Sequence, residues 1–474
     1  MLNVVDFKEY SYLFEYFSAI SAIPRGSGNC SGIADYLVDF AKARGLEYLR
    51  DGMNNVLIRK PATEGYENEP AIILQGHSDI VAEKTRDSTK DMISEGLDLY
   101  LDGEFIRARG TTLGADNGVA VVYALSVLDG RCEAHPAIEA LFTSDEETGL
   151  FGAAALDGEW LRGRLLVNID SDREGIFTVG CAGGMQVTVT RPAFGEKYCG
   201  EAQRLTVSGL LGGHSGVDID KGRENATKIL AELLSGLGEV RLISLSGGSK
   251  DNAIPRTAEC VFLPKVPIST GACEVLERIK AKYRDHEASI SIELSTVSTE
   301  GYLRSSDDSA AIISLLTELP SGIVKMSEEL KGQVETSLNL GITELTSDAL
   351  SLSFYVRSSR EGATAEVAEV IREIAEAHGA VAKIASSYPA WEYDPASPLR
   401  ERMVELYRES YGKEPVVNTI HAGLECGVIA AKVTGLDCIS MGPDIYDLHT
   451  TEEHLSVSSF VSVWEFICNF LKQK

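Results

Sequence analysis

Residues 138–152 have the sequence IEALFTSDEETGLFG, in which an apolar run leads into a charged turn. The apolar part, residues 137–143, has the length and composition of a buried strand. Glu146 and Glu147 follow where that strand should end. Adjacent residues that leave a strand point in different directions, so one carboxylate can bind a metal ion while the other accepts a proton from water. Two glutamates before Thr-Gly are also typical of a solvated turn, so this stretch needs support from the rest of the chain.

Two other apolar runs end in polar side chains of the same kinds. Residues 70–75, PAIILQ, lead into Gly-His77-Ser-Asp79, and residues 165–169, LLVNI, lead into Asp170. In open parallel sheets, ligands collect beyond the carboxyl ends of the strands. His77 and Asp79 share a face in extended chain, so that Asp79 can orient the imidazole. A single histidine after a strand is more often an ordinary polar group, but the three strand ends together predict a His/carboxylate cluster.

Asp116 lies in the sequence GTTLGADNG, residues 110–118, ahead of the apolar run VAVVYALSVL. This run is apolar on all sides, which predicts a buried helix over residues 119–128. An aspartate at this position can act as the N-cap of the helix. The glycines on each side of Ala-Asp-Asn also permit close approach of the backbone to a bound group, as a metal-bridging carboxylate requires.

The length and composition of the chain limit the classes of function. A chain of 474 residues predicts two domains, and a net charge of −27 disfavours nucleic acid and anionic membranes as partners. The sequence has no leader-like N-terminus and no apolar run long enough for a membrane span, so we expect a cytoplasmic protein. Nine scattered cysteines without CxxC pairs predict reduced thiols, and any metal site should use His and carboxylate ligands.

The pattern of expected strands and helices along the chain predicts a catalytic domain that is interrupted by a second domain. The catalytic domain is expected at residues 1–186 and 389–474, with the inserted domain at residues 187–388. In the catalytic domain, helices are expected at residues 10–20, 31–44 and 399–411, with strands at residues 55–59 and 416–420. In the inserted domain, we expect helices at residues 225–237 and 364–378, the second capped by Thr364, and a strand at residues 350–359.

These motifs resemble those of a known family. GHSD at residues 76–79, GADNG at 114–118, TSDEETGLFGA at 143–153, NID at 168–170 and the late His449 are similar to the M20 metallopeptidases. The stretches IPRGSGN, GTTLGADNGVA, DREGIFTVGCAGG, GGHSGVDIDKGRENA, DNAIPR and HAGLECG resemble its aminoacyl-histidine dipeptidase branch. The resemblance covers nearly the whole chain, from about residue 23 to residue 449. It implies an α/β exopeptidase domain with a mixed, mostly parallel sheet and an inserted α/β sandwich that acts as a lid.

The resemblance also implies two divalent metal ions per chain, with zinc as the expected ion. His77 and Asp170 would hold one ion, Glu147 and His449 would hold the other, and Asp116 would bridge them. Three protein contacts for each ion leave room for a shared water molecule. The family often reads His-Ser-Pro at the last ligand, where this chain has His-Thr-Thr, and Asp172 stands where a glutamate is common.

Further roles follow from the same resemblance. Glu146 would be the general base and Asp79 would orient His77. The resemblance places four residues near the substrate, namely His214, which would face the developing oxyanion, Asn252, Arg357 and His421. Arg357 suits a substrate carboxylate because its planar fork can pair with both oxygens. The family also contains homodimers, and the sequence does not tell whether His214 would act in its own subunit or in a neighbouring one.

The implied activity is the hydrolysis of short unblocked peptides, with Xaa-His dipeptides among them. The alternatives are another dimetal amidohydrolase, such as a tripeptidase or an N-acyl amino acid deacylase, and a metal-binding protein without catalysis. Four other histidines have no evident partners in the sequence. We expect His135, His286 and His378 to be structural, and His454 to be a surface residue at the start of a helix.

Overall fold

The computed structural model describes residues 5–266 and 270–474, and the chain divides into two compact units. Unit 1 consists of Met1–Cys181, Tyr393–Thr419 and Leu424–Lys474, and unit 2 consists of Ala182–Glu392 and Ile420–Gly423. The boundary expected after residue 186 falls inside β9 (Gly183–Pro192), which pairs along its whole length with β18 (Ala349–Ser358) of unit 2. Because β9 pairs with β18, unit 2 begins closer to the N-terminus than the sequence predicted. Residues 420–423 group with unit 2, although they were expected in the catalytic domain.

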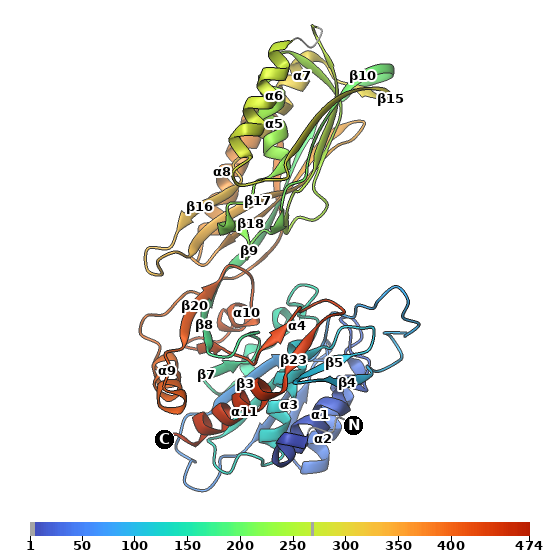
Figure 1. The fold of residues 1–474 in the computed structure, drawn as a ribbon. Coiled ribbons are helices and arrows are strands. Elements are labelled where there is room, and N and C mark those ends of the chain that lie inside the picture. The colour runs from blue at the N-terminus through green and yellow to red at the C-terminus, as the bar shows by residue number, and fades with distance from the viewer. Residues whose placement is uncertain (1–4, 267–269) are drawn as a thin grey trace. The chain divides into compact units, whose positions relative to one another are not determined.

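Unit 1 is built around a mixed sheet of eight strands (Figure 1). Its strands, in spatial order, are β1 (Glu47–Arg50), β2 (Val56–Lys60), β6 (Ile138–Thr143), β3 (Ile72–His77), β7 (Leu165–Asn168), β21 (Asp437–Ser440), β8 (Ile176–Cys181) and β20 (Val416–Ile420). β6, β3, β7 and β21 are parallel neighbours at the centre, whereas β1, β2 and β8 pair antiparallel. The parallel strands were expected from their continuous apolar runs, because such strands are buried on both faces.

The register of the central strands brings their carboxyl ends to one edge of the sheet. His77 of β3 pairs with Thr143 of β6, and Gln75 of β3 pairs with Asn168 of β7. Glu146 and Asp170 come shortly after these strand ends in the chain. The hydrogen-bond register therefore confirms the expected shared edge, because parallel strands that are in register end together.

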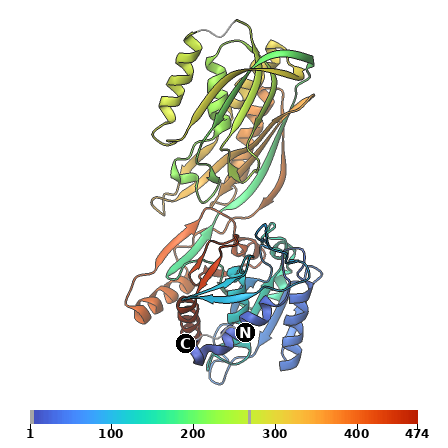
Figure 2. The same ribbon diagram turned by 45° about the vertical axis from the view of Figure 1, so that its right-hand side comes forward.

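The helices of unit 1 close the core around this sheet. They are η1 (Val5–Tyr10), α1 (Ser11–Ser21), α2 (Ser31–Arg44), α3 (Ala115–Leu128), α4 (Phe151–Ala155), η2 (Gly158–Trp160), α9 (Pro398–Tyr411), α10 (Glu425–Ala430) and α11 (Val457–Lys472). α3 is buried on almost every side, and its Tyr123 stacks on Phe460 of α11 with ring centroids 5.0 Å apart. Trp464 of α11 donates a hydrogen bond of 2.8 Å to Tyr12 of α1. Both marked chain ends lie in this unit (Figure 2).

A small second sheet in unit 1 corrects the expectation for His454. Its strands are β22 (Ile445–Tyr446), β23 (His454–Ser456), β5 (Phe105–Ala108) and β4 (Leu99–Asp102). His454 begins a strand instead of a helix, and its side chain is only 13% exposed. The ring lies 4.9 Å from the rings of both Tyr446 and Phe105. Pairing with β5, a strand far away in the sequence, overrides the local helix signal.

The expectation of reduced thiols is wrong for one pair of cysteines. Cys132, which follows α3, forms a disulfide with Cys468 of α11, with Cα atoms 5.6 Å apart. The two residues are 336 positions apart in the chain, so only the packing of α3 against α11 brings them together. Six other cysteines of the described chain form no disulfide: Cys30, Cys181, Cys260, Cys426 and Cys438, which are buried, and the exposed Cys199.

Unit 2 is an antiparallel sheet of nine strands with helices packed on one face (Figure 1). Along the sheet the strands are β15 (Ser291–Leu303), β10 (Glu196–Ser208), β14 (Ala258–Pro264), β12 (Val240–Gly247), β17 (Val334–Leu345), β18, β9 and β19 (Val381–Tyr388), with β16 (Gly322–Met326) beside β17. The helices are η3 (Ile219–Lys221), α5 (Ala226–Gly236), α6 (Thr270–Tyr283), α7 (Ser306–Glu318) and α8 (Ala363–Ala377). β11 (Gly213–His214) and β13 (Ala253–Ile254) form a separate pair. This is the expected α/β sandwich.

Capping explains where two helices of unit 2 begin. Asn225 caps α5 and accepts hydrogen bonds from the backbone N–H groups of Thr227 and Lys228. Gly362, with a φ of 77°, occupies the N-cap position of α8, so the expectation that Thr364 caps this helix is wrong. In the described part of the chain, no helix has both the length and the apolarity needed to cross a membrane.

Candidate metal centre

Six side chains meet at the carboxyl edge of the central sheet of unit 1. His77 is the last residue of β3, and Asp170 lies two residues after the end of β7. Glu146 and Glu147 lie in the loop between β6 and α4, Asp116 lies in the first turn of α3, and His449 lies between β22 and β23. The structure therefore brings together all of the residues that were named from the sequence as metal ligands or general base.

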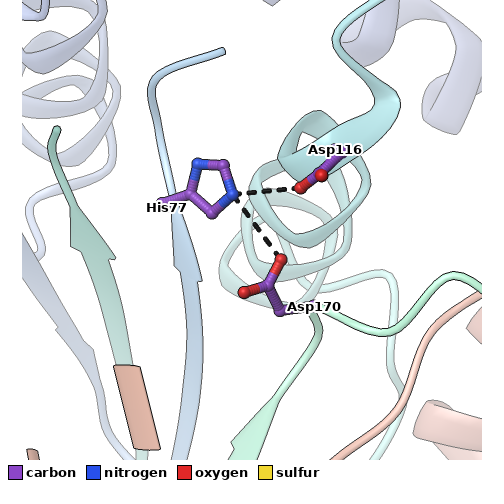
Figure 3. A group of neighbouring side chains, drawn as sticks. All are labelled: His77, Asp116 and Asp170. Carbon is purple, nitrogen blue, oxygen red and sulfur yellow. Dashed lines mark hydrogen bonds and ion pairs between the residues drawn. The ribbon is translucent and has the colours of Figure 1, made fainter. Parts of the chain in front are cut away.

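Asp116 lies between the two histidines. Its Oδ1 is 3.0 Å from Nε2 of His77, and its Oδ2 is 3.1 Å from Nε2 of His449. Figure 3 shows the His77 ring facing both Asp116 and Asp170, whose Oδ1 is 3.5 Å from the same nitrogen. Nε2 of His449 is also 3.1 Å from Glu147 Oε1. A carboxylate that offers one oxygen to each side has the geometry of a bridge between two ions.

The start of α3 decides between the two roles that the sequence left open for Asp116. Gly114 occupies the N-cap position with a φ of 66°, and no side chain caps this helix. Asp116 itself has extended backbone angles, with φ −81° and ψ 104°. Its carboxylate is therefore turned toward the histidines instead of the helix N–H groups, and the N-cap role is excluded.

Asp79 fixes the ring of His77 and the backbone of the two glutamates. Nδ1 of His77 lies 3.1 Å from the Asp79 backbone oxygen and 3.4 Å from its Oδ1. The same carboxylate accepts hydrogen bonds from the N–H groups of Glu146 and Glu147 and from the Ser27 hydroxyl. With Nδ1–H donated in this way, the lone pair of Nε2 points toward Asp116 and Asp170.

The charges of this cluster suit divalent cations. Asp116, Glu146, Glu147 and Asp170 are mostly buried, and within the described residues none of them forms an ion pair with a lysine or an arginine. Three groups of ligand atoms lie within 4.8 Å of one another: His77 with Asp116 and Asp170, His77 with Glu146 and Glu147, and Asp116 with Glu147 and His449. Imidazole nitrogens and carboxylate oxygens are common ligands of zinc. The donor set therefore fits two metal ions that share Asp116.

The electrostatics of the cluster agree with this assignment. Hydrogen bonds to Asp116 and Glu147 raise the pKa of His449 to about 11. Burial raises the pKa of Asp170 to about 6, and it raises the pKa of Glu146 well above its usual value. In the metal-free protein, these raised pKa values favour protons on the atoms that a metal ion would otherwise bind or neutralise. Perturbed values of this kind are typical of functional sites.

A second layer of buried polar side chains surrounds these residues and was missed from the sequence. Asn117 donates a 2.5 Å hydrogen bond to Asp170 Oδ1. Glu425, at the start of α10, accepts 2.6 Å hydrogen bonds from Gln75 and Thr143, and burial raises its pKa to about 7. Gln75 and Thr143 belong to the strand ends that were named, whereas Glu425 lies in HAGLECG, which was noted only as part of the family resemblance.

Arg25 and Glu453 were missed as well, although both are nearly inaccessible, with 1% and 3% of their surface exposed. Both contact the segment that carries Asp116. Arg25 lies in IPRGSGN, which was noted only as part of the family resemblance. Glu453 directly precedes His454, where a helix start was expected, and its distant partners leave no local signal.

In unit 2, the structure gathers the four residues that were named for substrate binding. Nδ1 of His214 accepts hydrogen bonds from the N–H groups of Gly216 and Val217. Nε2 of a neutral His214 therefore carries the proton, and burial beside the positive Arg357 lowers the pKa of this ring to about 4. His421 Nε2 lies 2.8 Å from the Ser337 hydroxyl. Asn252 is exposed, and its backbone oxygen accepts a hydrogen bond from Ser215, next to His214.

Arg357 is buried without a negative partner. Only 4% of its surface is exposed, and no carboxylate among the described residues forms an ion pair with it. Its Nη1 donates to the Tyr388 hydroxyl at 3.1 Å, and its guanidinium lies over the Tyr355 ring, 4.4 Å from the centroid. Nε of Arg357 has no hydrogen-bond partner. A buried guanidinium of this kind is suited to an anionic ligand.

Comparisons with known proteins agree with the fold. Residues 73–473 match the model of peptidase family M20/M25/M40. The chain is 35% identical over 472 residues to a cytosol non-specific dipeptidase of Escherichia coli, an alignment that covers 97% of each chain. The crystal structure of an aminoacylhistidine dipeptidase from Vibrio alginolyticus superimposes with a TM-score of 0.90 at 34% identity, covering 99% of this chain and 98% of that one. An aminopeptidase PepT from Bacillus cereus shares the fold at 17% identity, with a TM-score of 0.56 and 97% of each chain covered. The chain therefore belongs to peptidase family M20/M25/M40.

Proposed function

We propose that this protein is a metal-dependent dipeptidase of the cytoplasm that hydrolyses short unblocked peptides, with Xaa-His dipeptides among its substrates. The observation that carries the proposal is the position of Asp116 between His77 and His449, in a cluster of carboxylates that form no ion pair with a lysine or an arginine of the described residues. The dipeptidase activity and the cytoplasmic location are supported by the names of the relatives that are 34% and 35% identical.

Five side chains would hold two divalent ions, with zinc as the expected ion. His77 and Asp170 would bind one ion, Glu147 and His449 would bind the other, and Asp116 would contact both. When bound, such ions supply Lewis acidity, which polarises the scissile carbonyl and lowers the pKa of water. Asp79 would keep His77 in the tautomer whose Nε2 is free to bind, through the contacts of its backbone oxygen and carboxylate.

Glu146 would act as the general base. It lies beside the ligands, with Oε2 3.9 Å from Nε2 of His77, and it is the carboxylate of the cluster that the ligand assignment leaves free. It would take a proton from the attacking water and pass it to the leaving amine. Burial raises the pKa of Glu146 above its usual value, and a carboxylate with a raised pKa is a stronger base toward the attacking water.

The residues of unit 2 would recognise the two polar parts of the substrate. Neutral His214 would donate its Nε2–H to the developing oxyanion. Arg357 would pair with the terminal carboxylate of the substrate, which would supply the anion that its buried guanidinium lacks. Asn252 and His421, which flank His214 and Arg357, would contact the peptide backbone and the side chain of the substrate.

A hydrolysis panel with metal removal tests the proposal. The enzyme is stripped with a chelator, zinc is added back, and free dipeptides, tripeptides, C-terminally amidated dipeptides and N-acyl amino acids are compared. We expect activity to return with zinc, free dipeptides including Xaa-His to be hydrolysed, and the amides to be poor substrates. Rapid hydrolysis of tripeptides or of N-acyl amino acids, without activity on dipeptides, would instead make the protein a tripeptidase or a deacylase.

The variant Arg357→Ala provides a matched control for recognition of the carboxylate. Loss of Arg357 should raise KM for free dipeptides and remove the difference between free and amidated substrates, because the amide lacks the charge that Arg357 binds. If wild-type enzyme cleaves amides as fast as free dipeptides, the assignment of Arg357 to the carboxylate is wrong.

A further inference from the structure

We propose that Glu453 and Arg25 form a buried clamp that positions the loop of residues 113–116, and with it the Asp116 carboxylate, against the end of β3 that carries His77. Both are positioning residues and neither is a ligand. This inference rests on the proposed metal centre and adds a requirement for its assembly that the ligand set does not contain.

Glu453 binds the loop through its backbone donors. Its Oε2 accepts hydrogen bonds from the N–H groups of Leu113 and Gly114, at 2.8 and 2.9 Å. Its Oε1 accepts from Ala115 at 2.8 Å and from Asp116 at 3.4 Å. Four consecutive N–H groups at the start of α3 therefore converge on one carboxylate, and their orientation fixes the direction in which Asp116 leaves the backbone.

Arg25 donates hydrogen bonds to a backbone oxygen of the same loop and joins this loop to the segment that follows His77. Its Nη2 donates to the Gly114 backbone oxygen at 2.7 Å, and its Nη1 donates to the backbone oxygens of Ser78 and Asp79, at 3.0 and 3.3 Å. The planar guanidinium thus holds the segment after His77 and the segment before Asp116 at a fixed separation. A lysine could not make both contacts with the same geometry, because its ammonium is a single point of charge.

The two glycines around Asp116 are explained by this arrangement. A Cβ atom added to Gly114 would lie 3.1 Å from Arg25 Nη2, and one added to Gly118 would lie 2.7 Å from the same atom. Gly114 also has a φ of 66°, which disfavours residues with a side chain. The close approach that the sequence suggested for a bound group is therefore made by Arg25 at both glycines and, at Gly114, also by Ile80, whose Cγ2 would lie 2.7 Å from the added Cβ.

The clamp also contacts the segment that bears the other histidine. Glu453 follows His449 by four residues, and its N–H group donates to the Thr450 backbone oxygen at 3.2 Å. Asp116 Oδ2 lies 3.1 Å from His449 and Oδ1 lies 3.0 Å from His77. A shift of the 113–116 loop would therefore change the distances to both histidines at once. Since Asp116 would contact both ions, loss of the clamp should weaken both sites together.

The test compares zinc affinity in matched glutamine variants. Glu453→Gln keeps the size of the side chain but replaces one acceptor oxygen with an NH₂ group, which faces backbone N–H donors and cannot accept from them. Glu452→Gln is the control, because Glu452 is the neighbouring residue and its side chain is 76% exposed. We expect wild type and Glu452→Gln to bind two zinc ions alike in a titration against a chromophoric chelator. Glu453→Gln should bind both ions at least about tenfold more weakly.

Further readouts separate positioning from loss of fold. The metal-free Glu453→Gln protein should keep the circular dichroism spectrum of the wild type, and excess zinc should restore kcat without a change in KM. Glu453→Asp, which retains two acceptors on a shorter side chain, should recover part of the affinity. Arg25→Lys tests the other half of the clamp and should also weaken both ions, which keeps the proposal testable if one variant does not fold.

The outcomes distinguish this inference from the function on which it rests. Zinc affinity of wild-type strength in Glu453→Gln, or weakening of one ion alone, would overturn the clamp and leave the metal centre intact. A wild-type protein that binds no zinc at all would overturn the proposed metal centre, and the clamp with it.

Discussion

At the scale of single residues, Glu146 and Glu147 are neighbours whose side chains have different surroundings. Glu147 faces His449 at 3.1 Å, whereas Glu146 approaches His77 only to 3.9 Å. Asp79 holds the backbone N–H groups of both, so that their directions are fixed by the same carboxylate. This difference supports the proposal that Glu147 binds a metal ion and Glu146 transfers the proton.

The first prediction concerns Glu146→Gln. This substitution removes the proton acceptor but keeps the side-chain volume and the proposed ligands. We expect the variant to retain two metal ions and the wild-type fold, while kcat falls by about 10²–10⁴-fold. Turnover is measured together with zinc content. Loss of metal along with activity would show that Glu146 is a ligand.

The second prediction concerns the protons that metal binding displaces. The pKa of His449, raised to about 11 by Asp116 and Glu147, keeps this ring protonated in the metal-free protein at neutral pH. Zinc requires the neutral imidazole, so binding must release the proton, and the apparent affinity should rise with pH. The gain should be about tenfold per pH unit for each proton displaced.

Calorimetric titrations of zinc into the metal-free protein can measure this release. Two buffers that differ in ionisation enthalpy, both at pH 7, should give different binding enthalpies, and the difference yields the number of protons released. In His449→Ala this number should fall. Equal enthalpies in both buffers for the wild type would show that the His449 ring is already neutral before zinc binds.

At the scale of secondary-structure elements, α3 contributes at both of its ends. Asp116 lies in its first turn, and Cys132, just beyond its C-terminal end, is bonded to Cys468 of α11. Tyr123 stacks on Phe460 between these two points and donates a hydrogen bond to the Phe460 backbone oxygen at 2.6 Å. Helices α3 and α11 are therefore joined by packing, by a buried hydrogen bond and by a covalent bond.

The third prediction tests that covalent bond. Alkylation without reductant followed by mass spectrometry should leave Cys132 and Cys468 as one linked peptide pair, while Cys199 is modified. A disulfide typically adds about 2–4 kcal/mol to stability, so a reductant should lower the Tm of unit 1 by several degrees. The double variant Cys132→Ser/Cys468→Ser should have this lower Tm with and without reductant. Alkylation of both cysteines in native protein that was never reduced would disprove the bond.

At the scale of the whole molecule, the chain leaves unit 1 after Cys181, returns to it at Tyr393, and enters unit 2 again only for residues 420–423. The segment around the return differs from the one around the exit. Residues 183–192 form a paired strand, whereas residues 392–396 have no helix or strand and are mostly exposed. The glycines at positions 180, 183 and 184, near the exit, belong to strands β8 and β9.

The fourth prediction is that limited proteolysis cuts the native chain first within residues 392–396. Backbone in a paired strand resists proteases, because cleavage requires local unfolding. Mass spectrometry of the first fragments would locate the cut, and the fragments should stay associated through unit 1. Early cuts within residues 183–192 would show that β9 is less stably paired than the structure indicates.

The amino-acid sequence predicted the class of the fold and, together with the family resemblance, the residues of the proposed centre. Continuous apolar runs identified the parallel strands, since strands buried on both faces need apolar side chains throughout. Residues of metal-binding type at the ends of those runs then identified His77, Glu146, Glu147 and Asp170. These signals are local, because each joins a strand to the few residues that follow it.

The residues that support that centre became visible only in the folded chain. Glu453 contacts a loop more than 300 positions earlier in the chain, and Arg25 joins two loops that are themselves far apart in the sequence. The Cys132–Cys468 bond and the strand that begins at His454 also depend on partners that are distant in the sequence. The sequence shows the type of each of these residues but not its partner, because the partner is brought near only when the strands and helices pack.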